Sequence, residues 1–207
     1  MGRGTFDKVI KISFIVIKKM EIRRLKTEKE IKEVFAMSKD YTNNHQTFRE
    51  YMAKYRKYPD LFFGAYDGDK LIGEAFGYLR DDGACELHSI AVHGLKWKRG
   101  IGRKLIRVFE NACKKYSSRV DVSTRGKPEG FYLRVGYKVR GLLAVYEHGG
   151  HLPSGLNVQH LDTSIRRRDN TRFAFFLTPD IEGNERKRFE RKLKADEVCL
   201  VLEKRLR

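Results

Sequence analysis

A glycine-spaced turn near the middle of the chain has the composition of a site for an anionic ligand. A segment that alternates like a strand leads into Arg99-Gly100-Ile101-Gly102, and a strongly amphipathic stretch follows at 102–116. Two glycines at this spacing let the backbone turn tightly and approach a ligand without Cβ clashes. Amides in the first turn of a helix have no intrahelical partner and, with the helix dipole, favour an anion. Positive charge gathers at the same place, on Lys96, Lys98, Arg99, Arg103 and Lys104.

A pyrophosphate is the group that this turn suits best. The turn is not a P-loop, because no Gly-Lys-Ser/Thr follows its glycines. It also lacks the third glycine of a dinucleotide fingerprint, and the strands predicted ahead of it form a meander rather than a βαβ unit. A glycine turn shaped only for packing stays open as the alternative.

The strand ahead of the turn carries two side chains that can accept a proton. Strand alternation places Glu86 and His88 on one face and Cys85 and Leu87 on the other. Each has an ordinary structural alternative: a solvated or ion-paired carboxylate for Glu86, and a packed or hydrogen-bonded imidazole for His88. The strand therefore offers two candidate bases for one site.

Other polar clusters give weaker signals. The histidines His148, His151 and His160 lie among flexible glycines without a clear fourth ligand, so we expect loop surface and no metal site. Arginines at 166–168 and 186–191 form basic clusters without a nucleic-acid-binding motif. A solvated charged face is favoured for them, and a nucleic-acid partner stays open.

The composition is typical of a soluble globular protein, and its excess of positive charge predicts an anionic partner. The 207 residues include 44 Lys and Arg against 27 Asp and Glu, a formal charge of +17. The scattered cysteines Cys85, Cys113 and Cys199 form no CxxC pair, which indicates reduced, buried thiols in a cytoplasmic protein. The apolar run 9–17 is too short to span a bilayer, and we expect no membrane partner.

The hydrophobic pattern orders the elements that must position these residues. We expect residues 1–19 to be an N-terminal extension and 20–207 to form one domain. Capping boxes at Thr27–Glu30 and Thr47–Glu50 predict two amphipathic helices after a first strand at 20–25. Strands are predicted at 61–66, 71–79, 84–92, 119–124, 137–147 and 197–204, with helices at 102–116 and 128–135. About 148–194 is an insertion between the last two strands, with a charged helix near its end.

Two motifs together resemble the GNAT superfamily of acetyl-CoA-dependent N-acetyltransferases. Ser89-Ile90-Ala91-Val92, the basic stretch and Gly100-Ile101-Gly102-Arg103-Lys104-Leu105 look like its acetyl-CoA motif, and Phe131-Tyr132-Leu133-Arg134-Val135-Gly136-Tyr137 resembles its next one. With the order of elements, the resemblance covers roughly two thirds of the chain. Trp97 departs from it, since the family usually has Arg or Gln there.

This resemblance implies an α/β (α+β) fold with a mixed, mostly antiparallel central sheet and helices on both faces. It also implies acetyl-CoA as co-substrate, a primary amine as acceptor, Glu86 as base and Tyr132 as general acid. The pantetheine arm would bind along the strand and the pyrophosphate at the turn, on Ile90, Ala91, Val92, Lys98, Arg99, Gly100, Ile101, Gly102, Arg103 and Lys104. The acceptor, peptide or small molecule, is not identified by the sequence.

Two further questions stay open at this point. A non-catalytic GNAT-like module that binds RNA or an acidic protein is the alternative function, and the basic insertion is the feature that favours it. A homodimer is compatible with the sequence. We also expect the insertion to shape the acceptor site, because in the resembling family the last two strands flank the acceptor entrance.

Overall fold

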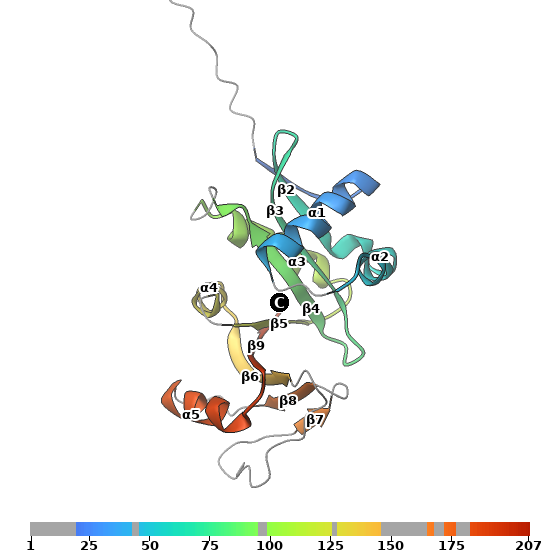
Figure 1. Cartoon of the computed structure of the whole chain (residues 1–207). Coiled ribbons are helices and arrows are strands. Elements are labelled where there is room, and N and C mark those ends of the chain that lie inside the picture. Colours follow the sequence, from blue (N-terminus) through green and yellow to red (C-terminus); the bar gives the residue numbers. More distant parts are fainter. Residues whose placement is uncertain are drawn as a thin grey trace, which may run out of the picture.

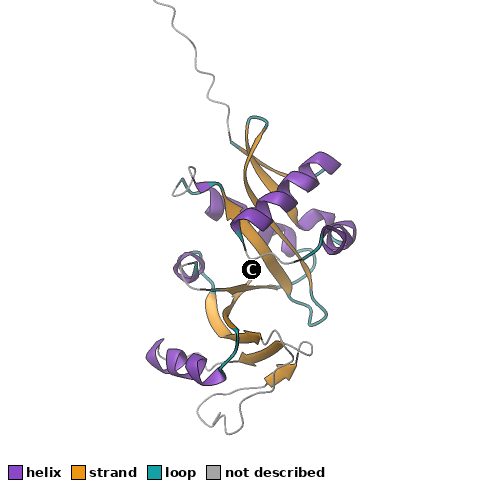
Figure 2. Cartoon of the chain, viewed as in Figure 1, coloured by secondary structure: helices purple, strands orange, loops and turns teal. Residues whose placement is uncertain are grey.

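A computed structural model describes residues 20–42, 46–94, 99–125, 128–145, 165–167, 172–176 and 183–207 (Figures 1 and 2). The predicted extension 1–19 and the three histidines of the insertion lie outside the described residues. Lys98, one of the expected phosphate-binding cations, lies outside them too.

The N-terminal elements form as their capping signals predict. Strand β1 (Glu21–Arg24) precedes helices α1 (Glu28–Tyr41) and α2 (Phe48–Lys57). Both helices begin with a capping box in which the cap threonine and the glutamate three residues later satisfy each other's backbone amides. A short 3₁₀ turn at Pro59–Leu61 then leads into the sheet.

A meander of three antiparallel strands follows, and then a strand–helix–strand crossover. The meander consists of β2 (Phe62–Asp67), β3 (Lys70–Leu79) and β4 (Cys85–Val92). The crossover continues with α3 (Ile101–Cys113), β5 (Arg119–Thr124), α4 (Glu129–Arg134) and β6 (Lys138–Val145). Helix α3 ends three residues before the prediction, because the amides of Lys115 and Tyr116 bond three residues back and tighten the chain into a turn.

The insertion adds strands to the sheet, which the sequence analysis did not predict. It contains β7 (Ile165–Arg167), β8 (Arg172–Phe176) and α5 (Gly183–Leu193), and β9 (Glu197–Arg205) follows. The described strands form one sheet in the order β1-β2-β3-β4-β5-β9-β6-β8-β7. Strand β8 pairs with the edge of β6, and β7, β8 and α5 lie at the end of the sheet farthest from α1 and α2 (Figure 1).

The sheet is mixed and mostly antiparallel with helices on both faces, which confirms the predicted fold class. Among the described strands, β4 and β5 are the only parallel neighbours. Tyr51 of α2 packs edge-on against Phe76 of β3, and Phe109 of α3 lies against the opposite face of β3 at Gly77. Helices α1 and α2 therefore cover one face of the meander, and α3 covers the other (Figure 1).

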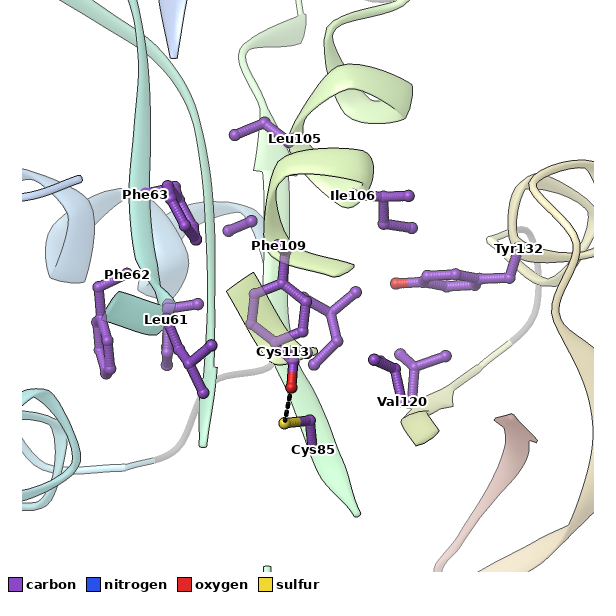
Figure 3. Close-up of a cluster of buried hydrophobic side chains, with 14 of the residues drawn as sticks. Leu61, Phe62, Phe63, Cys85, Leu105, Ile106, Phe109, Cys113, Val120 and Tyr132 are labelled. Atoms are coloured by element: carbon purple, nitrogen blue, oxygen red, sulfur yellow. Dashed lines mark hydrogen bonds between the residues drawn. The ribbon is translucent and has the colours of Figure 1, made fainter. Parts of the chain in front are cut away.

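The three cysteines are buried and free of disulfides, as expected. Cys85 and Cys113 lie in the apolar cluster between β4 and α3, together with Leu105, Ile106 and Phe109 (Figure 3). No helix in the described part of the chain is long and apolar enough to cross a membrane.

Candidate active site

Strands β4 and β5 separate after a very short stretch of pairing. Their parallel register covers only Cys85 with Val120 and Glu86 with Asp121. Beyond Glu86, β4 continues to Val92 and pairs with β3 on one side only, as far as the described residues go. The backbone groups on the other edge of 87–91 can therefore bind an extended ligand in the way an added strand would. The predicted pantetheine-binding residues Ile90, Ala91 and Val92 lie on this part of β4.

A bulge in β4 changes which face its side chains occupy. Phe76 of β3 pairs with Ser89 and the next residue, Gly77, pairs with Leu87, so His88 is the extra residue. Before the bulge, the predicted alternation is confirmed: Cys85 contacts α3, and Glu86 with His88 lies on the opposite face. The bulge was not predicted, because no residue type in the segment signals it.

The consequence of the bulge is that His88 and Ser89, although adjacent, face the same side. Ser89 bonds Glu74 on the face covered by α1 and α2, where His88 also contacts Phe76. Val92, in contrast, lies near Gly102 on the α3 face. The candidate bases and the glycine turn therefore lie on opposite faces of β4, and an extended ligand along β4 can reach both.

Gly77 makes the bulge sterically allowed. A Cβ at this position would collide with the carbonyl oxygen of Glu86 and lie 2.6 Å from Cζ of Phe109. The two strands and α3 approach one another here more closely than any larger residue permits. Gly77 thus helps to fix the backbone at Glu86.

Glu86 is held among charged neighbours where the two strands separate. Its carboxylate oxygens lie 3.6 Å from a guanidinium nitrogen of Arg80 and 3.6 Å from Nδ1 of His88. Arg80 also donates a hydrogen bond of 2.9 Å to Asp121, the residue opposite Glu86 on β5. Burial raises the pKa of Asp121, and the charge of Arg80 opposes that rise. The side chain of Glu86 is 14% exposed, which gives it contact with solvent as well as with the ion pair.

His88 is packed between aromatic rings. Its imidazole lies 5.5 Å from the ring of Phe76 and 5.7 Å from that of Tyr78, measured between centroids. This position agrees with the packed alternative for His88 and leaves it in contact with Glu86. The two candidate bases therefore lie in contact with each other.

The glycine turn forms the N-terminus of α3, as expected. Gly100 is the N-cap in the left-handed conformation, with φ of 76°, and no side chain caps the helix. Lys104 donates its amide to the carbonyl of Gly100, so the amides ahead of it in the first turn have no intrahelical partner. Ile101 is buried, and Arg99, Arg103 and Lys104 are exposed around the turn. The uncapped amides and the surrounding cations have the arrangement that the predicted anion site requires.

Gly102 brings the second predicted motif next to the turn. A Cβ on Gly102 would lie 3.3 Å from the ring of Phe131 on α4 and 3.9 Å from a methyl group of Val92. The structure therefore places the turn, the end of β4 and α4 side by side, although α4 begins almost 30 residues after the turn in the sequence.

Tyr132 projects from α4 toward α3 and the end of β5. Its hydroxyl points into the region between Ile106 and Val120 (Figure 3). Burial raises the pKa of its phenol, and the carboxyl of Glu74 raises it further. Within the described residues, its hydroxyl has no hydrogen-bond partner. It is thus a protonated donor, which suits the predicted general acid.

Sequence reasoning missed Glu74, a fully buried carboxyl on β3. Its pKa is raised to about 8 by burial, against which a hydrogen bond from Ser89 acts. A signal was available: Glu74 is the only charged residue in the otherwise uncharged run 71–79. A strand buried on both faces tolerates such a residue only where a polar partner exists, and no sequence pattern identified Ser89 as that partner.

Comparison with known proteins agrees with this geometry. Residues 59–139 match the family model described as acetyltransferase (GNAT) domain. No curated protein sequence matches the chain. Solved structures with the same fold are numerous, all of those compared below being less than 20% identical to this chain.

Three of these structures show the extent of the similarity. Ard1 from Thermoplasma volcanium is 16% identical, with a TM-score of 0.54, over 79% of this chain and 99% of its own. Naa50 from Arabidopsis thaliana, in complex with the bisubstrate analogue CoA-Ac-MVNAL, is 13% identical, with a TM-score of 0.57. The match covers 89% of this chain and 97% of the Naa50 chain. An acetyltransferase from Bacillus subtilis in complex with CoA is 15% identical, with a TM-score of 0.54. The match covers 91% of this chain and 100% of the other chain.

Proposed function

We propose that this chain, which has the GNAT fold and carries a GNAT acetyltransferase domain at residues 59–139, transfers an acetyl group from acetyl-CoA to a primary amine. The acceptor is a peptide, a protein or a small molecule. One observation carries the proposal: β4 leaves β5 after Glu86, and the N-terminus of α3, which no side chain caps, lies beside the far end of β4, where Val92 is next to Gly102.

Binding of acetyl-CoA follows from the two ends of that edge. The pantetheine arm carries amide groups that pair with backbone groups of Ile90, Ala91 and Val92. The pyrophosphate accepts hydrogen bonds from the first-turn amides of α3, and Arg99, Arg103 and Lys104 neutralise its charge. Lys98 is proposed to contribute a further positive charge. This arrangement directs the thioester along β4 toward the point where the strands separate.

Transfer from a protonated amine requires two protons to leave the nitrogen, one before and one after attack, and one proton to reach the thiolate. An amine with an ordinary pKa of about 10.4 arrives protonated at neutral pH, so the site must supply a base. Glu86 accepts that proton, directly or through a water, from the face that it shares with His88. The nitrogen then attacks the thioester carbonyl, the C–S bond breaks, and Tyr132 gives its proton to the departing sulfur. The proton that remains in excess on the nitrogen leaves as the amide forms and returns the Tyr132 phenolate to the phenol. A backbone amide of β4 polarises the carbonyl oxygen.

The amine enters from the face of β4 that α1 and α2 cover, because both candidate bases lie there. The Naa50 structure holds an analogue that joins CoA to a short peptide, which makes peptide N-termini a natural first class of acceptor to test. We propose that the insertion between β6 and β9 contributes to acceptor selection, since it extends the sheet beside β6. RNA or protein binding without catalysis is the outcome that would replace this proposal.

The test is acetyl transfer by the purified full-length chain. The protein is incubated with acetyl-CoA and a panel of peptides, amino sugars and small amines, and mass spectrometry detects the acetylated acceptor. Tyr132→Phe serves as the matched control, because it keeps the ring and removes the proton donor. Binding of CoA in calorimetry without transfer to any amine, in parent and variant alike, would reject the catalytic function and favour a binding module.

A further inference from the structure

A carboxyl group that has no charged partner in the described part of the chain lies in the interior between β3 and the helices α1 and α2. Glu74 is fully buried, and its Oε1 lies 2.6 Å from Oγ of Ser89 on β4. Its other oxygen, Oε2, is buried without a hydrogen-bond partner in the described residues. Burying an ionised carboxylate in this way is costly. The protonation state of Glu74 therefore determines which groups donate and which accept the hydrogen bonds around it.

The hydrogen bonds around Glu74 form a chain that ends on α1. Oγ of Ser89 lies 3.4 Å from Oγ1 of Thr42, the C-cap of α1, and either oxygen can be the donor. Thr42 in turn donates its hydroxyl to the carbonyl of Ser38 at 2.6 Å. The chain therefore runs from β3 through β4 to the end of α1.

Counting protons distinguishes the two states of Glu74. Each hydroxyl has one proton to donate. If Glu74 is ionised, Ser89 donates to it and Thr42 donates to Ser38, so the contact between Ser89 and Thr42 has no proton. If Glu74 is protonated, it donates to Ser89, Ser89 donates to Thr42, and Thr42 donates to Ser38. Only the neutral acid supplies a proton to every contact in the chain.

The surroundings favour the neutral acid. Among the described residues, Glu74 interacts with Ser89 on β4 through a hydrogen bond and with Tyr51 on α2 and Tyr132 on α4 electrostatically, and none of the three is a cation. Burial raises the pKa of Glu74 to about 8. At neutral pH the carboxyl is therefore mostly protonated.

Ser89 connects this chain to the candidate catalytic residues. It follows the bulged His88 directly and faces the same side, so its hydroxyl must be satisfied in the interior for the bulge to keep its shape. The orientation of His88 and Glu86 depends on that shape, because both precede Ser89 on the same strand and face.

We propose that Glu74 is a positioning residue which, as a neutral acid, holds Ser89 and thereby fixes the β4 bulge that orients Glu86 and His88. Its ionisation at alkaline pH removes the proton between Ser89 and Thr42 and loosens this part of β4. The catalytic consequence rests on the proposed function, whereas the structural consequence does not.

Three variants of the full chain test the proposal. Glu74→Gln keeps a neutral side chain that can donate and accept, Glu74→Leu keeps the approximate volume without polar atoms, and Ser89→Ala removes the link. Hydrogen exchange of the amides at 86–92 is measured from below to above pH 8, with exchange rates corrected for their intrinsic pH dependence. Protection in the parent should fall as pH passes the pKa of about 8, and in Glu74→Gln it should stay constant.

Activity gives an independent measurement if the chain transfers acetyl groups. The ratio of kcat/KM of Glu74→Gln to that of the parent should be near one below pH 8 and rise above it, with CoA affinity unchanged. Glu74→Leu and Ser89→Ala should lose kcat at every pH. Identical exchange profiles for parent and Glu74→Gln, or full protection in a folded Ser89→Ala variant, would overturn the proposal. Absence of transfer with the expected exchange profiles would reject only the proposed function.

Discussion

Glu86 on β4 lies opposite Asp121 on β5, and this is the last pair that the two parallel strands form. Arg80 contacts both carboxylates, 2.9 Å from Asp121 and 3.6 Å from Glu86. The two strands thus separate directly after a pair of carboxylates that share Arg80, and one of these carboxylates, Glu86, is a candidate base. The catalytic and structural roles of Glu86 can be separated by substitution.

Glu86→Gln should reduce kcat/KM by about 10²- to 10⁴-fold, because the amide keeps the shape of the side chain but cannot accept a proton. CoA affinity, measured by calorimetry, should stay near the parent value. The acid limb of the pH–rate profile should disappear or move in the variant.

His88→Gln is the matched comparison, since His88 contacts Glu86 and is the rival base. A small effect of Glu86→Gln together with a large effect of His88→Gln would transfer the role to His88. Full activity in both variants would indicate that the amine arrives already neutral and that the protein only positions it.

Tyr132→Phe should lower the rate while leaving the fold as stable as before or slightly more stable. Tyr132 is buried and phenylalanine keeps its ring, so the packing of the side chain is preserved. Rate loss should be smaller for thioesters whose thiolate leaves easily. Urea unfolding and steady-state kinetics on the same preparations check both parts, and equal losses for all thioesters would argue against an acid role.

Gly102→Glu should abolish CoA binding, because it fills the approach to the first turn of α3 and adds an anion there. The new side chain would also meet the ring of Phe131, 3.3 Å from the position of its Cβ. Asn111→Glu is the control: it adds the same charge on an exposed position of the same helix, about 14 Å further along. Calorimetry measures the CoA affinity of both variants. Tight binding by Gly102→Glu would show that CoA binds elsewhere than at the first turn of α3.

Gly77→Ala should destabilise the protein by about 3 kcal/mol or more, or prevent folding, because its Cβ would overlap the carbonyl of Glu86 and crowd Phe109. Gly94→Ala, where a Cβ meets nothing within 4 Å, should change stability by less than about 0.5 kcal/mol. Urea unfolding of the three proteins provides the measurement. Equal stability would mean that the strands can move apart at the bulge.

The stability of the parent should fall with rising pH relative to that of Glu74→Gln. The pKa of Glu74 is about 8 in the folded state, against an ordinary value of 4.5, so the folded protein binds more protons between these values. Stability from the buried neutral acid is complete below pH 4.5 and is lost as pH rises through 8. The difference between the two proteins should change by roughly 1.4 kcal/mol per pH unit within this window. A constant difference from pH 5 to 9 would show that Glu74 keeps an ordinary pKa.

Local patterns in the sequence were sufficient to predict most elements, whereas the anion site at the glycine turn stays a prediction. Capping boxes marked α1 and α2, and the glycines at 100 and 102 marked the start of α3, because such signals depend on residues three or four positions apart. The roles of Glu86 and Tyr132 followed from resemblance and remain predictions. The added strands β7 and β8 were missed, because their pairing with β6 depends on contacts between distant segments.

The sequence by itself determined the order of the elements, the glycine turn with its cations, and the face on which Glu86 and His88 lie. Only the tertiary structure decided that β4 and β5 separate after Glu86, that a bulge at His88 turns Ser89 inward, and that Glu74 meets Ser89 in the interior. Side-chain periodicity is a property of one strand and can be read from its residues. Strand register, bulges and the pKa of a buried acid arise from neighbouring strands and helices, so they exist only once those elements are packed together.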